Sequence, residues 1–168
     1  MPQTVILSGA RTPFGRLGGS LASVSAVQLG TRAAVAAIER SGVRPDEFDY
    51  TIFGNVVQAG VGHIPSRQVS LAAGIPEHIG SDTINKVCAS GMRAATLADQ
   101  LIRVGDHRVL LAGGMESMSS APYLLPRARS GYRYGDAALL DALLVDGLRD
   151  PWSGKVMYEQ ASEIASEL

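Results

Sequence analysis

The chain has 168 residues, of which 46 % are hydrophobic and 18 % are charged, and its formal net charge is −1. This composition is typical of one globular domain with a hydrophobic core, and it excludes a disordered chain. A charge balance so near zero gives no support for a nucleic-acid or acidic-membrane partner. The single cysteine, Cys88, excludes an internal disulfide bond and any metal site that needs several cysteines.

The hydropathy pattern of the chain does not suggest a membrane protein. The apolar stretches are strand-sized and broken by glycine or charge, so we expect no membrane span. The first three residues lead directly into an apolar run without a basic segment, so we expect no signal peptide. We therefore expect a cytoplasmic protein.

Strand-like and helix-like segments alternate over the first two thirds of the chain. Apolar, β-branched runs predict strands over residues 4–9, 49–57, 81–87 and 107–112. Apolar residues at helical spacing predict helices over residues 25–41, 66–73 and 88–104. Ser23 or Ser25 is expected to cap the first helix, and Gly42 to end it. This order predicts a layered α/β sheet with helices packed on it.

The character of the chain changes after Gly113-Gly114. Residues 115–135 are rich in Ser, Pro, Tyr and Arg and predict no regular element. Helices are expected over residues 136–145 and 156–168. Because the last helix reaches the final residue without a capping glycine, we expect the chain to stop inside a domain.

Cys88 lies where the third predicted strand meets the third predicted helix. A thiol at the first turn of a helix faces unpaired N–H groups and the positive end of the helix dipole, and both favour thiolate over thiol. The neighbours Ala89, Ser90 and Gly91 are small and leave room for a substrate carbonyl. The pattern indicates a catalytic nucleophile, and a buried structural cysteine is the alternative.

Three histidines and one carboxylate are weaker candidates. His63, His78 and His107 lack the spacing of metal ligands, and we expect each to be a surface or hydrogen-bonded residue. Glu116 follows a predicted strand end. It could act as an acid or base, or it could satisfy backbone amides in a loop.

Several segments together resemble the thiolase family. They are Ala10-Arg11-Thr12-Pro13-Phe14-Gly15, Gly54-Asn55-Val56-Val57-Gln58, Arg67-Gln68, Ile84-Asn85-Lys86-Val87-Cys88-Ala89-Ser90-Gly91-Met92 and Ala112-Gly113-Gly114-Met115-Glu116-Ser117-Met118-Ser119. The likeness runs with near-constant spacing from Val5 to about Leu148, and within the family it is nearest to acetoacetyl-CoA thiolases, also called acetyl-CoA acetyltransferases. The resemblance implies that Cys88 is the nucleophile that accepts the acyl group.

The resemblance also implies the fold class: α/β, a thiolase-like layered α/β/α half-core with the start of an inserted loop domain. Residues 1–116 would form the N-terminal core half (βαβαβαβ), and residues 117–168 would start the loop domain, in which the chain ends. The C-terminal half of the family would be absent, since its Asn-Glu-Ala-Phe, Gly-His-Pro and Cys-Gly-Gly-Gly motifs do not occur. The chain would then hold the nucleophile without the histidine base, and without the cysteine that moves the α-carbon proton.

By resemblance, the reaction is acyl transfer between Cys88 and coenzyme A. It condenses two acetyl-CoA molecules to acetoacetyl-CoA, or cleaves a 3-ketoacyl-CoA by thiolysis as in fatty acid metabolism. Coenzyme A enters as a substrate, and we expect neither a metal nor another cofactor.

The same resemblance assigns the remaining site residues. Met157 is expected to wall the acyl pocket, Leu148 to contact the pantetheine, and the backbone at Gly91 to support the oxyanion. Val156 and Tyr158 replace a histidine and a glycine of the family. These two replacements leave the acyl chain length open.

The resemblance implies two similar core halves that pack together, so the predicted N-terminal half alone would expose faces that the C-terminal half normally covers. We therefore expect a complementary chain or subunit that carries the missing half, or a homodimer across the strand that leads to Cys88. The resemblance also implies tetramers, with contacts in residues 123–135. Two alternatives stay open: a β-ketoacyl synthase-like condensing enzyme, and a catalytically silent thiolase fragment or assembly subunit. The Gly-Gly-Met-Glu-Ser-Met run favours a thiolase over the synthase.

Overall fold

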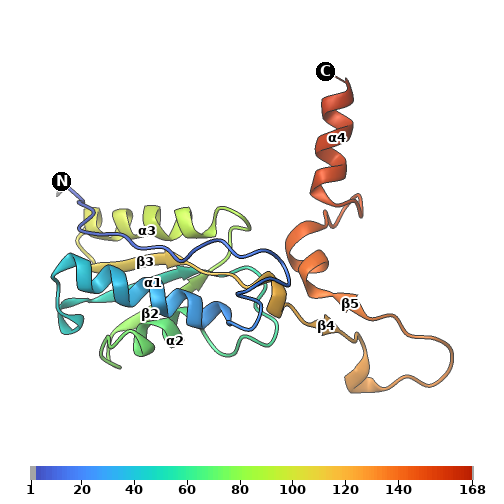
Figure 1. The fold of residues 1–168 in the computed structure, drawn as a ribbon, viewed down its shortest axis with the longest axis horizontal. Coiled ribbons are helices and arrows are strands. Elements are labelled where there is room, and N and C mark those ends of the chain that lie inside the picture. Colours follow the sequence, from blue (N-terminus) through green and yellow to red (C-terminus); the bar gives the residue numbers. More distant parts are fainter. Residues whose placement is uncertain (1–2, 168) are drawn as a thin grey trace. The chain divides into compact units, whose positions relative to one another are not determined.

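The computed structural model describes residues 3–167, which separate into two compact units. The first unit ends at Ser120 and the second begins at Ala121. The first unit is a three-layer α/β/α structure, with a parallel sheet between helices (Figure 1). This confirms the predicted α/β class. The assignment of residues 117–168 to an inserted loop domain stays a prediction.

The sheet of the first unit has three parallel strands in the order β2-β1-β3. They are β1 (Tyr50–Gly54), β2 (Gly80–Ile84) and β3 (Leu110–Gly114). The register aligns Gly54 with both Ile84 and Gly114, so all three strands end at the same edge. The central strand β1 is the most buried, because it has a strand on each side and helices on each face.

Helices cover both faces of this sheet (Figure 1). They are α1 (Ala26–Ser41), α2 (Pro65–Ala72) and α3 (Ser90–Val104). The helices α1 and α2 pack together on one face, and α3 covers β1 and β3 from the other. The chain moves from β1 to β2 in one direction and from β2 to β3 in the other. Because such crossovers are right-handed, the two connecting helices fall on opposite faces.

Small residues on the helices allow this close packing. The buried stripe of α3 consists of Ser90, Ala94 and Ala98, each one turn apart. On the other face, Phe53 and Leu111 from the sheet join the main cluster of buried residues with residues of α1 and α2. Both helices are therefore held by apolar contact with the sheet.

The second unit contains short elements and one longer helix. They are β4 (Tyr123–Leu124), paired antiparallel with β5 (Leu140–Asp141), a 3₁₀ turn (Ala128–Ser130), a π-helical turn (Leu144–Leu148) and α4 (Met157–Glu167). Ala142 is fully buried, and its N–H donates to the carbonyl of Pro122 at 3.1 Å. No helix within residues 3–167 is long and apolar enough to cross a membrane.

The strand expected over residues 4–9 is wrong. These residues have no regular secondary structure and join no sheet, and Val5, Ile6 and Leu7 are 69 %, 91 % and 59 % exposed. The segment is attached to α1 instead: Ser8 Oγ donates to the carbonyl of Ala37 at 2.6 Å, and Arg40 donates to that of Gly9 at 2.9 Å. A β-branched run favours an extended backbone, but a strand also needs a neighbouring strand to pair with.

The helix expected over residues 136–145 is also wrong, because pairing with β4 places Leu140 and Asp141 in a strand. The Asp141 carboxylate accepts the N–H of Leu143 at 2.9 Å, just before the π-helical turn begins. Tertiary pairing overrides local helix propensity here. The other predicted elements are present with bounds that differ by a few residues, and residue 168 of the last helix lies outside the described residues.

The structure chooses between the two expected caps of α1. Ser25 Oγ accepts the N–H of Gln28 at 3.2 Å, and Gln28 Oε1 accepts the N–H of Ser25 at 3.0 Å, which forms a capping box. We predict that Ser25→Ala lowers the free energy of unfolding by about 1 kcal/mol in urea titrations. The control Ser23→Ala should change it little, and equal losses in the two variants would contradict this assignment.

Candidate active site

Three loops meet at the edge where the strands end. Residues 85–90 follow β2, residues 55–58 follow β1, and residues 115–117 follow β3. In parallel α/β sheets, ligands bind outside the carboxyl ends of the strands. This edge, which carries Cys88, is therefore the candidate site.

Cys88 lies in an exposed turn between β2 and α3, residues 85–90, which we name the cysteine loop. The helix begins at Ser90, so the expected start at Cys88 is wrong by two residues. Val87 has a left-handed backbone with φ of 49°, which interrupts the helical conformation just before the cysteine. The Cys88 thiol is free and exposed, which does not fit a buried structural cysteine.

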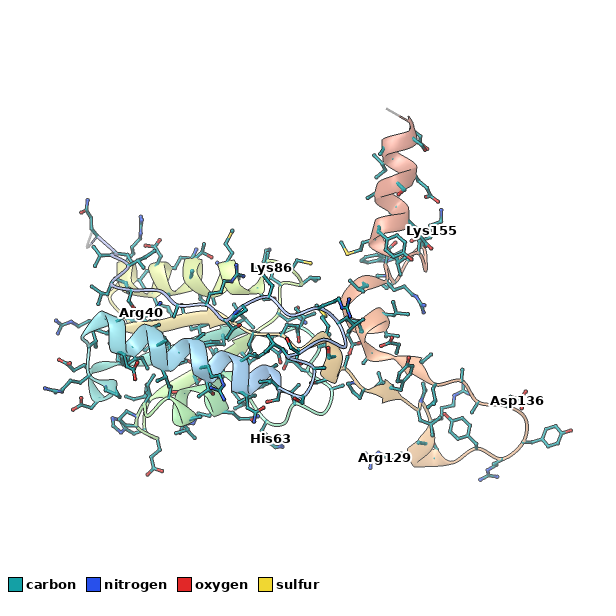
Figure 2. The ribbon with its side chains drawn as sticks, in the orientation of Figure 1. Arg40, His63, Lys86, Arg129, Asp136 and Lys155 are labelled. Atoms are coloured by element: carbon teal, nitrogen blue, oxygen red, sulfur yellow. The ribbon has the colours of Figure 1, made fainter. Side chains whose placement is uncertain are left out.

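Two side chains hold the backbone of the cysteine loop. Asn85 Oδ1 accepts the N–H of Val87 at 2.9 Å. Ser90 Oγ accepts the N–H of Lys86 at 2.8 Å and donates to the carbonyl of Val87 at 2.6 Å. Ser90 is only 5 % exposed, whereas Lys86, labelled in Figure 2, faces solvent. The cysteine loop is thus fixed on its buried side by Ser90 and exposed to solvent on its other side.

Glycines let the first turn of α3 rest directly on the strand ends. A Cβ atom at Gly54 would lie 2.5 Å from Ser90 Cβ and 2.6 Å from Ser90 C. A Cβ atom at Gly114 would lie 3.0 Å from Gly91 Cα. Real side chains do not approach backbone so closely, so glycine is required at Gly54 for this contact.

Glu116 ties the ends of β1 and β3 together. Its Oε1 accepts from Asn55 Nδ2 at 2.8 Å, and its Oε2 accepts the N–H groups of Val56 at 2.8 Å and Val57 at 3.3 Å. The N–H of Asn55 donates to the carbonyl of Ile84 at 3.1 Å, which extends the link to the base of the cysteine loop. These bonds support the second interpretation of Glu116, a carboxylate that satisfies loop amides.

The predicted site residues fall in both units. Gly91 shares the first turn of α3 with the cysteine loop, and within residues 3–167 no acceptor pairs with its N–H or with that of Cys88. Met157, 51 % exposed, begins α4, and Leu148 ends the π-helical turn of the second unit. The roles of Gly91, Met157 and Leu148 stay predictions.

The histidines play other parts. His107 precedes β3 and stacks on Tyr50 with ring centroids 4.5 Å apart, and its Nδ1 lies 3.7 Å from Asp49 Oδ1. Burial, aided by the carboxylate of Asp82, raises the pKa of Tyr50. His63 and His78 are exposed. In the described part of the chain, no group of three or more His, Cys, Asp or Glu side chains could hold a metal ion.

Sequence reasoning missed three residues of this edge: Asn55, Val87 and Ser90. Each matches the family resemblance only as part of a longer segment, and nothing in its local pattern predicted a separate role. The available signal was a polar residue directly after a buried strand for Asn55, and a serine among small residues for Ser90. The left-handed conformation of Val87 had no signal, because valine disfavours it.

Comparison with known proteins places this geometry in a family. The family model described as thiolase, N-terminal domain, matches residues 4–168. A probable acetyl-CoA acetyltransferase of Mycolicibacterium smegmatis is 50 % identical over 153 residues, which cover 91 % of this chain and 39 % of that protein. The acetyl-CoA acetyltransferase of Cupriavidus necator is 46 % identical over 99 % of this chain and 42 % of its own length.

A solved structure agrees with the sequence matches. The crystal structure of the Acat5 thiolase from Ascaris suum, in complex with coenzyme A, superimposes with a TM-score of 0.92 at 41 % identity. The match covers 96 % of this chain and 42 % of that one. The chain belongs to the thiolase family and carries its N-terminal domain. It spans about two fifths of the length of the relatives that it matches.

The glycine contact beneath the cysteine loop can be tested by overpacking. We predict that Gly54→Ala lowers the free energy of unfolding by about 3 kcal/mol, because the new methyl group meets backbone atoms of Ser90 and Gly91 that cannot rotate away. The matched control is Gly9→Ala, where a Cβ atom meets nothing within 4 Å. Urea titrations that show similar small losses for both variants would contradict the contact.

The Glu116 link can be tested with an isosteric amide. In Glu116→Gln, one carboxylate oxygen becomes an NH₂ group that faces either Asn55 Nδ2 or the Val56 N–H, and donors then oppose each other. We predict a loss of about 2 kcal/mol in unfolding free energy. Glu39→Gln, on the exposed side of α1, is the control and should be nearly neutral. A neutral result at Glu116 would show that its bonds contribute little.

Proposed function

We propose that this chain supplies the acyl-accepting cysteine of a thiolase-type acyltransferase, and that Cys88 is that cysteine. The observation that carries the proposal is the position of Cys88: a free, exposed thiol on the loop between the parallel strand β2 and the first turn of α3. Family membership and relatives named acetyl-CoA acetyltransferase support the same assignment.

In the proposed reaction, the sulfur of Cys88 attacks the carbonyl carbon of acetyl-CoA, and CoA leaves as its thiol with the proton that Cys88 loses. The α-carbon of a second acetyl-CoA then loses a proton to a general base and attacks the acetyl carbonyl. The thioester bond to Cys88 breaks, the sulfur takes up the proton, and acetoacetyl-CoA is released. Thiolysis of a 3-ketoacyl-CoA is the reverse. The free N–H groups of Cys88 and Gly91 are the proposed oxyanion donors, and each such donor lowers the barrier by roughly 3 kcal/mol. Met157 and Leu148 are proposed to contact the acyl and pantetheine groups.

The general base is proposed to come from protein outside these 168 residues. The related proteins are more than twice as long, and Glu116 is fully engaged with N–H donors. We propose a complementary segment or subunit as the partner. We also propose a homodimer across β2, which lies at an edge of the described sheet and pairs there with β1 alone.

The proposal predicts that the chain forms an acetyl-enzyme but does not turn over by itself. After incubation with acetyl-CoA, mass spectrometry should find one acetyl group on the Cys88 peptide, and none in Cys88→Ala. Ketothiolase turnover should appear only when the C-terminal portion of the Cupriavidus necator enzyme is added or fused. Turnover by the chain alone would contradict an external base. No acetylation in any form would favour a silent assembly subunit.

A further inference from the structure

We propose that Ser90 and Asn85 are positioning residues that hold Val87 in a left-handed conformation and thereby aim Cys88 at its substrate. The inference deepens the proposed function and rests on Cys88 being the acyl acceptor. We use the name Val87 latch for the side chains of Ser90 and Asn85 together with the backbone of Lys86 and Val87, to which they are hydrogen-bonded.

The backbone of Val87 has an unfavourable conformation. Its φ of 49° lies in the region that glycine and asparagine adopt with ease and that a β-branched residue disfavours. A residue stays there only when its surroundings over-determine the conformation. Without restraint, rotation at Val87 would redirect the next residue, which is Cys88.

Hydrogen bonds from two side chains restrain the backbone of Val87. Ser90 Oγ is bonded on both sides of the strained peptide, to the Lys86 N–H at 2.8 Å and to the Val87 carbonyl at 2.6 Å. Asn85 Oδ1 takes the Val87 N–H at 2.9 Å. Both polar groups of the Val87 backbone are therefore bonded to side chains, and the Val87 carbonyl also accepts the backbone N–H of Ser90 at 3.1 Å.

Packing against β1 holds Ser90 in place. The Ser90 side chain is buried, and it lies against Gly54 so closely that no Cβ atom fits between them. Ser90 is thus packed against the end of β1, and the Val87 latch fixes the position of Cys88 relative to the sheet. Because acyl transfer depends on the approach of the sulfur and on the adjacent N–H groups, loss of this reference should slow the chemistry more than it unfolds the chain.

The test measures the rate at which acetyl-CoA acetylates Cys88 in the 168-residue chain. We expect Ser90→Ala to be slower by about tenfold or more, with Asn85→Ala changed in the same direction. The added change Val87→Gly should restore the Ser90→Ala rate to within about threefold of the parent, because glycine adopts the left-handed conformation without the steric cost that valine incurs. A merely structural role of Ser90 would not be rescued in this way.

The matched control is Ser41→Ala. Ser41 Oγ also donates to a carbonyl, that of Ile38 at 2.7 Å, and accepts an N–H, that of Val43 at 3.0 Å, but at the far end of α1. Its loss should lower stability as much as that of Ser90 and leave acetylation unchanged. If Ser90→Ala does not fold, Asn85→Ala, which changes an exposed side chain, decides the question in its place.

Amide hydrogen exchange provides a second readout that needs no acyl transfer. The Lys86 amide should exchange faster in Ser90→Ala, and the Val87 amide faster in Asn85→Ala, than in the parent chain. Unchanged acetylation in both variants, or failure of Val87→Gly to restore it, would overturn the latch. An inert parent chain whose amides still respond would instead remove the proposed function and leave the latch geometry in place.

Discussion

The contact between the first turn of α3 and the glycine ends of β1 and β3 is the constraint on which the candidate site depends. Because Gly54 and Gly114 have no side chain, the backbone of Ser90 and Gly91 rests on the sheet itself. Backbone against backbone leaves no flexible group to yield, so the contact transmits the position of the sheet to the helix. Cys88, two residues before the helix, inherits that position.

Polar bonds complete what the glycines begin. Glu116 and Asn55 join the ends of two neighbouring strands, and the N–H of Asn55 reaches the last residue of the third. Asn55 is only 1 % exposed and Glu116 is half-buried, so these bonds are partly shielded from water, which strengthens a carboxylate that accepts several N–H groups. The edge is therefore held by hydrogen bonds and close packing while its thiol is exposed, which agrees with the proposal that Cys88 is a nucleophile.

Apolar surface remains open elsewhere on the first unit. Val5, Ile6 and Leu7 are exposed beside α1, and Phe14 and Met92 are exposed as well. Surface of this kind commonly marks an interaction site. It agrees with the proposal that this chain works with further protein, and the greater length of its relatives points in the same direction.

The sequence by itself determined the α/β class, the family, most of the helices and strands, and the place of Cys88 between a strand and a helix. The family follows from the motifs that resemble those of thiolases, and the other features follow from local periodicity and from glycine and capping residues, which act over a few positions. Only the tertiary structure decided that residues 4–9 are not a strand, that Glu116 binds amides of another loop, and that Val87 is left-handed. The first two depend on partners distant in the chain. The third depends on side-chain bonds from Asn85 and Ser90 that oppose the local preference of valine, and that preference is what a sequence pattern reports.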